Sequence, residues 1–134
     1  MNKSIRALGE VGLRVNHLAP TTAFYRDVVG LEIFDEGPGY VFFRVAEGIE
    51  GHPQLLVLFD RGVEVGMATT TLDHLAFVID MDDYEHERRR LEGLGLNVFV
   101  KQFPRFHWRS LFFSDPEGNT VEFVANDLTV GAAE

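Results

Sequence analysis

LFFSDPEGNTVEFV, residues Leu111 to Val124, contains two short apolar segments separated by a turn. Within the turn, Asp115, Pro116 and Gly118 suit the first, second and last positions of a type I turn. The residues after the turn alternate, so Glu122 lies in the middle of a strand between Val and Phe. A carboxylate buried in such a strand without a partner is costly. A bound cation would remove that cost, and the remaining sequence can be searched for its other ligands.

The overall composition excludes several classes of protein. The chain has 134 residues, of which 46% are hydrophobic and 25% are charged, and this predicts one compact globular domain. No apolar run approaches the length of a membrane span and no secretory signal is apparent, so we expect a cytoplasmic protein without a membrane partner. The absence of cysteine excludes disulfides, zinc fingers and thiol nucleophiles. The net charge of −9 argues against nucleic acid as a partner, and the one basic cluster, residues 88–90, is interpreted as a solvated helix face with acidic neighbours.

The chain contains two copies of one element order. The segment 8–13, LGEVGL, corresponds to LDHLAF, which begins 64 residues later. Modules over about 7–60 and 71–126, joined by a connector over 61–70, are predicted to form a single domain spanning 1–134. Each module is predicted to contain a strand, a helix and three strands: strands at about 7–15, 31–35, 40–45 and 54–59 with a helix at 21–29, then strands at about 72–79, 96–102, 109–113 and 120–125 with a helix at 82–94.

Glycines and small residues mark the ends of these elements. Gly30 and Gly95 are predicted to end the two helices, because glycine readily adopts the conformation that helix C-termini favour. The residues after Asn126 are small and polar, and they are predicted to be weakly ordered.

The repeat places Glu10 and His74 at equivalent positions on equivalent strands. Each lies on the strand face opposite the larger apolar side chains. If the modules pair around a pseudo-twofold axis, these two side chains can converge, and Glu122 can lie beside the first strand of its own module. One histidine and two glutamates on a wall of strands can bind a divalent metal and leave positions open for substrate or water.

The motifs EVGLRV, FYRDVVGL, DHLAFV and FFSDPEGNTVEFV together resemble the vicinal oxygen chelate superfamily, over about Gly9 to Ala125. This superfamily includes glyoxalase I, bleomycin-resistance proteins, fosfomycin-resistance enzymes and extradiol dioxygenases. The resemblance implies an α+β fold of two βαβββ modules whose curved sheets form a half-open barrel around a divalent metal. It also implies that Glu10, His74 and Glu122 are the metal ligands, and that Glu122 is therefore part of the catalytic machinery.

The chain departs from the family pattern at two positions. Glu10 stands where His or Gln is most familiar, although an oxygen ligand is chemically acceptable. Glyoxalase I also places a Glu on the last strand of its first half, whereas the matching strand here, residues 54–59, reads QLLVLF. Three ligands fit the fosfomycin-resistance and dioxygenase branches better, although those branches usually carry two His and one Glu. Two carboxylates favour Mn, Mg, Fe(II) or Zn, and Ni is kept as a further candidate.

The resemblance implies a metal-dependent enzyme that chelates a small substrate through vicinal oxygens. The metal acts as a Lewis acid or as an electron conduit to dioxygen, which suits a lyase or isomerase, a ring-cleaving dioxygenase or an epoxide-opening transferase. The alternative is a metal-free protein of the bleomycin-resistance type, which sequesters a cationic drug. A homodimer is predicted, because half-open sheets leave edges and apolar faces that need cover. The sequence leaves open whether one chain or two would form the site.

An aromatic segment over residues 103–109, FPRFHWR, allows two interpretations. It is either a pocket lid in which His107 shuttles a proton, or a hydrophobic loop that packs at a dimer interface. Arg109 could steady an anionic substrate, but a surface ion pair is the simpler interpretation. The remaining histidines are predicted to lie in loops or on an exposed helix face and to need no function: His17, His52 and His86.

Overall fold

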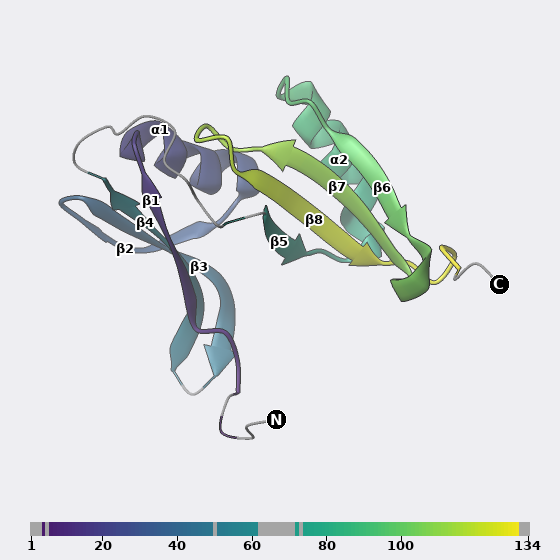
Figure 1. Ribbon diagram of the computed structural model, residues 1–134, viewed down its shortest axis with the longest axis horizontal. Helices are drawn as coiled ribbons and strands as arrows, with labels where there is room; N and C mark the ends of the chain where they lie inside the picture. The colour runs from purple at the N-terminus through teal and green to yellow at the C-terminus, as the bar shows by residue number, and fades with distance from the viewer. Residues whose placement is uncertain (1–3, 5, 50, 62–71, 73, 132–134) are drawn as a thin grey trace. The chain divides into compact units, whose positions relative to one another are not determined.

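The computed structural model describes residues 4, 6–49, 51–61, 72 and 74–131. The chain divides into two compact units, Met1–Ala68 and Thr69–Glu134. Most of the predicted connector, residues 62–70, lies outside the described part of the chain. Each unit contains one four-stranded sheet with helical segments, as Figure 1 shows. Among the described residues, no helix is both long and apolar enough to cross a membrane.

The first unit follows the predicted order of strand, helix and three strands. Its sheet has the order β1-β4-β3-β2, with β1 parallel to β4 and the other neighbours antiparallel. Its elements are β1 (Glu10–Val15), α1 (Leu18–Ala23), the π-helix η1 (Phe24–Val29), β2 (Glu32–Gly37), β3 (Tyr40–Ile49) and β4 (His52–Asp60).

The second unit repeats this topology. Its sheet has the order β5-β8-β7-β6, and β5 is again parallel to the last strand of the unit. Its elements are β5 (His74–Val78), the short 3-10 helix η2 (Met81–Asp83), α2 (Tyr84–Gly93), β6 (Phe99–Phe103), η3 (Pro104–Phe106), β7 (Trp108–Ser114) and β8 (Thr120–Asn126). The predicted α+β class and the two βαβββ modules are therefore confirmed.

Each unit has a core between its helix and its sheet. In the first unit Tyr25 and Phe43 are both fully buried, and their ring centroids are 6.2 Å apart. In the second unit Leu91 of α2 and Leu111 of β7 are fully buried. The hydroxyl of Tyr84 donates a hydrogen bond of 3.0 Å to the Ser110 carbonyl, which ties α2 to the sheet. Burial of each such side chain contributes roughly 1.5–3 kcal/mol.

The turn and the helix ends are as predicted. The amide of Gly118 donates to the Asp115 carbonyl at 3.1 Å, and the Asp115 carboxylate accepts the amides of Glu117 and Asn119. Gly118 has a φ of 84°, a conformation that glycine adopts without strain. Gly30 and Gly95 follow the two helices with φ values of 91° and 85°.

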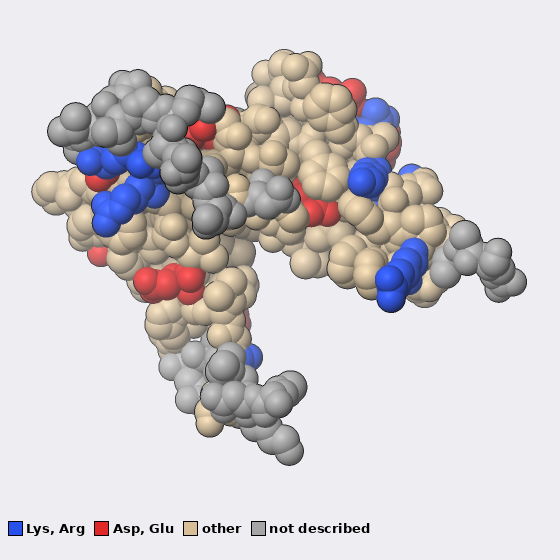
Figure 2. All heavy atoms as spheres, in the orientation of Figure 1, with Lys and Arg blue, Asp and Glu red and all other residues tan. Residues whose placement is uncertain are grey.

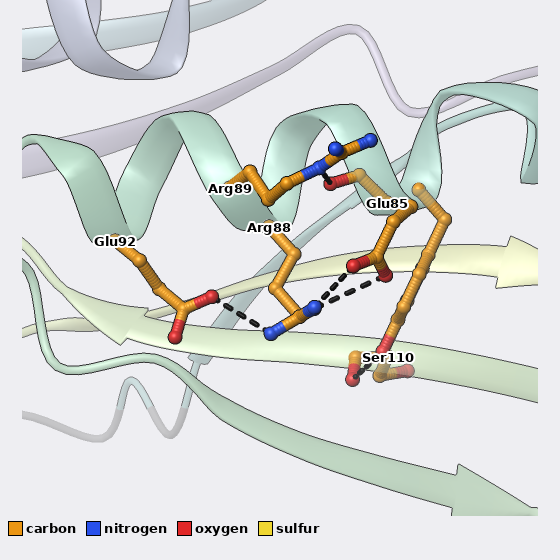
Figure 3. Close-up of polar contacts among 6 residues, drawn as sticks. Glu85, Arg88, Arg89, Glu92 and Ser110 are labelled. Atoms are coloured by element: carbon orange, nitrogen blue, oxygen red, sulfur yellow. Dashed lines mark hydrogen bonds and ion pairs between the residues drawn. The ribbon is translucent and has the colours of Figure 1, made fainter.

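The surface charges form short, local ion pairs. On the face drawn in Figure 2, acidic and basic side chains lie in small, separate groups. On α2, Arg88 pairs with Glu85 and with Glu92, and Figure 3 shows these side chains above the strand that carries Ser110. The prediction of a solvated basic face with acidic neighbours is confirmed.

The prediction of a weakly ordered tail after Asn126 is wrong for residues 127–131. The carboxylate of Asp127 accepts hydrogen bonds from the amide and the hydroxyl of Thr129, and both bonds involve Oδ1. Val130 is buried, and its amide donates to the Asp127 carbonyl at 3.0 Å. Asp127 thus organises a turn, and a small polar composition did not reveal this local hydrogen bonding.

Candidate metal centre

The second unit brings two of the predicted ligands together. In the parallel pair β5–β8, His74 lies opposite Thr120 and Ala76 lies opposite Glu122, so His74 and Glu122 share one face of the sheet. The Nε2 atom of His74 is 3.2 Å from Oε1 of Glu122. The Glu122 side chain is 8% exposed and the His74 side chain is 40% exposed. A buried carboxylate therefore meets an accessible imidazole on this face.

The second oxygen of Glu122 is held by Ser110 of β7. The Ser110 hydroxyl donates a hydrogen bond of 2.7 Å to Oε2, and Ser110 is fully buried. Each oxygen of the Glu122 carboxylate thus has a polar partner, His74 for Oε1 and Ser110 for Oε2. These partners explain how the carboxylate can be buried. Sequence reasoning missed Ser110, although a small polar residue inside the apolar strand WRSLFFS was a signal of it.

The His74–Glu122 pair fits a divalent metal. Donor atoms that each lie about 2.0–2.2 Å from one ion are roughly 3–3.5 Å apart at neighbouring corners of its coordination shell. The 3.2 Å between the two donor atoms falls in this range. Imidazole nitrogen with carboxylate oxygen suits Zn, Mn or Fe. Considering only the described residues, no group of three or more potential ligands is assembled, so this pair would supply two of the three predicted donors.

The third predicted ligand, Glu10, belongs to β1 of the first unit. It lies opposite Leu55 of β4, and its Oε2 is 3.7 Å from Nε2 of His52. Its side chain is 53% exposed. Its convergence with His74 and Glu122 would join the two units, and this stays a prediction. Sequence reasoning placed His52 in a loop without function; His52 instead begins β4 beside Glu10.

The internal repeat also identifies the first-unit equivalent of Glu122. Ala76 pairs with Glu122 in the second unit, and its equivalent Gly12 pairs with Val57 in the first. Val57 is 1% exposed. The position where a fourth, carboxylate ligand would be expected by analogy with glyoxalase I thus holds a buried valine.

His107 contacts the C-terminal residues. Its Nδ1 lies 2.9 Å from the Val130 carbonyl, and its own carbonyl accepts the Asp127 amide at 2.7 Å. It adjoins Trp108, which pairs with Asn126 on β8, four residues beyond Glu122 and thus on the order of 13 Å along the strand. These contacts give His107 a structural part in holding residues 127–130, and a catalytic role for it stays a prediction.

Arg109 forms an ion pair, as the simpler interpretation predicted, but its partner Asp127 is buried and does not lie on the surface. Its Nε donates to Oδ2 of Asp127 at 2.9 Å. The hydrogen bonds from Thr129, and then the one from Arg109, hold the pKa of the Asp127 carboxyl below its usual value. Arg109 is thereby engaged with Asp127 at the C-terminal end of the sheet.

The aromatic segment forms a partly exposed cluster beside this end of the sheet. The rings of Phe106 and Trp108 stack with centroids 4.8 Å apart, and Phe103 lies edge-on to Trp108 at 6.5 Å. Phe106 and Trp108 are 50% and 43% exposed. Both the lid and the dimer-contact interpretations remain predictions.

Comparison with known proteins gives several relatives that extend over nearly the whole chain. The metallothiol transferase FosB of Staphylococcus epidermidis is 24% identical over 92% of this chain and 86% of its own length. The lactoylglutathione lyase of Haemophilus influenzae is 28% identical over 87% of this chain and 90% of its own length.

Solved structures show the same fold. The lactoylglutathione lyase of Agrobacterium tumefaciens superposes with a TM-score of 0.74, at 28% identity, over 92% of this chain and 96% of that one. A variant of the fosfomycin resistance protein FosX of Listeria monocytogenes, complexed with Mn(II) and 1S,2S-dihydroxypropylphosphonic acid, gives a TM-score of 0.71 at 23% identity over 94% of each chain. The family model described as the Glyoxalase/Bleomycin resistance protein/Dioxygenase superfamily matches residues 7–123, and the chain belongs to this superfamily.

Proposed function

We propose that this protein is a metal-dependent enzyme that chelates a small substrate through vicinal oxygens on a divalent ion bound by Glu10, His74 and Glu122. The observation that carries the proposal is the 3.2 Å approach of His74 Nε2 to the buried carboxylate of Glu122. The names of the relatives support it, since they include a metallothiol transferase and a lactoylglutathione lyase. The FosX structure adds support, because its ligands are Mn(II) and a compound with adjacent hydroxyl groups.

The residues of the second unit have distinct tasks in this proposal. Ser110 fixes the Glu122 carboxylate by holding Oε2, so that Oε1 faces His74. The burial of Glu122 protects this arrangement from competition by water. His74 is more exposed and lies where a substrate can approach. A divalent metal, when bound, supplies a Lewis acid to the substrate oxygens, and three protein ligands leave positions open for them.

Val57 guides the choice among enzyme classes. Because this buried valine occupies the first-unit equivalent of Glu122, β4 offers no carboxylate there. We therefore place the activity with the three-ligand classes, a ring-cleaving dioxygenase or an epoxide-opening transferase, ahead of a four-ligand lyase or isomerase.

The proposal is tested first by metal content. Protein purified without chelator should contain stoichiometric divalent metal, and His74→Ala and Glu122→Gln should lose it. His86→Ala is the matched control, because His86 is an exposed histidine of α2. If neither wild type nor variants bind metal, while the wild type binds a basic glycopeptide tightly, the protein sequesters a cationic drug and the enzymatic proposal fails.

The reaction class is tested by a screen of the reconstituted protein. Mn, Fe(II), Zn, Mg and Ni would each be combined with catechols, with fosfomycin plus a thiol, and with methylglyoxal–thiol adducts. We expect turnover with one of the first two substrate groups and its loss in Glu122→Gln. Turnover of methylglyoxal–thiol adducts alone would contradict the argument from Val57.

A further inference from the structure

Trp108 lies on the same sheet face as Glu122. Side chains alternate along β7, so Trp108, Ser110 and Phe112 point to one face. The Ser110 hydroxyl donates to Glu122 at 2.7 Å, which identifies this face as the one that bears the candidate ligands of the second unit. Trp108 pairs with Asn126 of β8, four residues beyond Glu122, so its backbone lies on the order of 13 Å from that of Glu122. The indole ring therefore stands at the end of this face, where a molecule that extends beyond the candidate centre can reach it.

The side chains between Glu122 and Trp108 on this face are small. Val124 follows Glu122 on β8, and it pairs with Val78 of β5 and with Ser110 of β7. Val78 is 84% exposed. The Ser110 hydroxyl is already bonded to Glu122. This part of the face therefore offers an apolar floor between the carboxylate and the indole ring, and such a surface favours contact with apolar groups.

A stacked ring and the C-terminal turn hold Trp108 in place. The Phe106 ring stacks on the indole with a centroid distance of 4.8 Å. His107, between these two residues, has a φ of 59°, which is uncommon for a residue other than glycine. Its carbonyl accepts the Asp127 amide at 2.7 Å, and its Nδ1 donates to the Val130 carbonyl at 2.9 Å. The turn thus supports this conformation through both backbone and side chain, which favours a fixed wall over a mobile lid.

The exposed area of the aromatic rings suits a small molecule better than a second copy of the chain. Phe106 is 50% exposed and Trp108 is 43% exposed, and Phe99, which pairs with Phe112 on the same face, is 68% exposed. Since an aromatic side chain presents about 150–250 Å², the three rings leave roughly 250–400 Å² uncovered. A stable protein interface buries about 800 Å² on each partner. One planar, apolar group of a bound molecule is enough to cover the indole ring.

We propose that Trp108 is a specificity-determining residue of the proposed centre, and that its ring contacts a planar, apolar group of the substrate beyond the chelated oxygens. This rests on the proposed function. An aromatic diol whose ring carries a second planar group can extend from Glu122 to Trp108, whereas a small aliphatic epoxide cannot. The inference therefore selects aromatic diols with a planar substituent as the substrate class.

The direct test follows the indole N–H resonance in NMR spectra of the full chain with Zn²⁺. Trp108 is the only tryptophan of the sequence, so this resonance is unambiguous. 3-Phenylcatechol should shift it and should bind about tenfold more tightly than catechol, which lacks the second ring. Equal affinities of the two diols, each dependent on Zn²⁺, overturn the inference and leave the proposed function intact. If neither diol binds, the inference also fails, and Zn²⁺ binding measured without a diol decides separately on the proposed centre.

Substitution of the ring gives a second readout. Trp108→Ala should lower the affinity for 3-phenylcatechol to that for catechol and leave the affinity for catechol unchanged. Phe34→Ala is the matched control and should keep the preference, because Phe34 of β2 is exposed to a similar degree, 45%. If Trp108→Ala keeps the preference and instead converts a dimer into a monomer, the ring contacts a second copy of the chain and the inference is overturned.

The part played by the C-terminal turn is tested with Asp127→Ala, which removes the carboxylate that accepts both hydrogen bonds from Thr129. In the folded variant, verified by circular dichroism, the indole N–H resonance should move before any diol is added, and the preference for 3-phenylcatechol should fall. A variant that is less stable but keeps both the resonance and the preference would overturn the positioning role of the turn.

Discussion

The two units have the same strand order and the same parallel pairing of first and last strands, yet they differ on the sheet face that bears the candidate ligands. Where the second unit holds Glu122, the first holds Val57, and both residues are buried. The scaffold thus accepts an apolar side chain at this position without difficulty. The carboxylate of the second unit is therefore not a requirement of the fold, which supports the proposed role of Glu122 as a ligand.

The neighbouring strand differs in a matching way. Ser110 pairs with Val124 and Phe112 with Glu122, whereas in the first unit Tyr40 and Phe42 take the corresponding positions on β3. The tyrosine hydroxyl donates to Asp35 at 3.3 Å and forms no equivalent of the Ser110–Glu122 bond. The polar pair in the second unit therefore depends on two residues, Ser110 and Glu122, that both differ from their first-unit equivalents, Tyr40 and Val57.

The largest effect is expected from placing a carboxylate in the first unit. Val57→Glu should reduce the free energy of unfolding by about 3–5 kcal/mol, because the charge would be buried without the serine that supports Glu122. Denaturant unfolding measures this. Val57→Thr keeps the shape and serves as the control with a smaller effect. If the Val57→Glu protein is as stable as wild type, the sheet face around Val57 in the first unit tolerates a buried carboxylate as well as the face around Glu122 in the second unit does.

Removal of either ligand in the second unit should have the next largest effect. His74→Ala and Glu122→Gln should weaken binding of Mn²⁺ by more than the ~10–100-fold that outer-shell partners cost. Glu122→Gln keeps an acceptor for Ser110, so its fold should be preserved. Calorimetric titration measures the affinity. If both variants bind Mn²⁺ as tightly as wild type, His74 and Glu122 are not metal ligands.

A smaller effect should follow from removing the hydrogen bond that holds the Glu122 carboxylate while leaving Glu122 itself in place. Ser110→Ala removes the 2.7 Å hydrogen bond to Oε2, and we expect metal affinity to fall about tenfold because Glu122 loses its fixed orientation. Stability should fall by roughly 1 kcal/mol. Tyr40→Phe in the first unit is the matched control, with no change in affinity expected. Equal effects of the two substitutions would contradict the assignment of Ser110 to Glu122.

The smallest effect concerns the pH dependence of the C-terminal turn. The pKa of Asp127 is lowered in the folded chain, so its contribution to stability is present above the pKa of the unfolded chain. That contribution is lost as the pH falls through the lowered, folded-state value. Asp127→Asn should therefore have a slightly lower melting temperature than wild type at neutral pH, and the difference should shrink in acid. A constant difference between pH 7 and pH 3 would exclude this linkage.

Sequence reasoning captured the features that depend on local chemistry and on the repeat. The turn at Asp115 follows from residues adjacent in the chain, and its hydrogen bonds are those expected. The approach of His74 to Glu122 follows from placing the first and last strands of one module side by side. The two modules could be found because the repeat preserves apolar spacing even where identity is slight.

The features that escaped prediction depend on register and on backbone approach. Ser110 meets Glu122 only because β7 and β8 pair in one particular register, and this is fixed by the whole strand pair. His52 was assigned to a loop because the apolar pattern of β4 begins only after it, whereas the strand itself begins at His52. This early start depends on the close approach of the Gly48 and His52 backbones, which leaves no room for a Cβ atom on Gly48. The C-terminal turn depends on Asp127, whose partner Arg109 lies 18 residues away.

The hydrogen bond from Ser110 has a consequence for selectivity among hard cations. Because Oε2 accepts the hydrogen bond of the serine hydroxyl while Oε1 faces His74, we expect Oε1 to be the preferred donor to an ion in the proposed centre. Calcium ions favour shells of six to eight oxygens, to which carboxylates often contribute both atoms, whereas smaller divalent ions accept fewer donors at shorter distances. If Glu122 coordinates through Oε1 alone, the proposed centre should disfavour Ca²⁺, and the Ser110 hydroxyl would then contribute to selectivity against an abundant competitor.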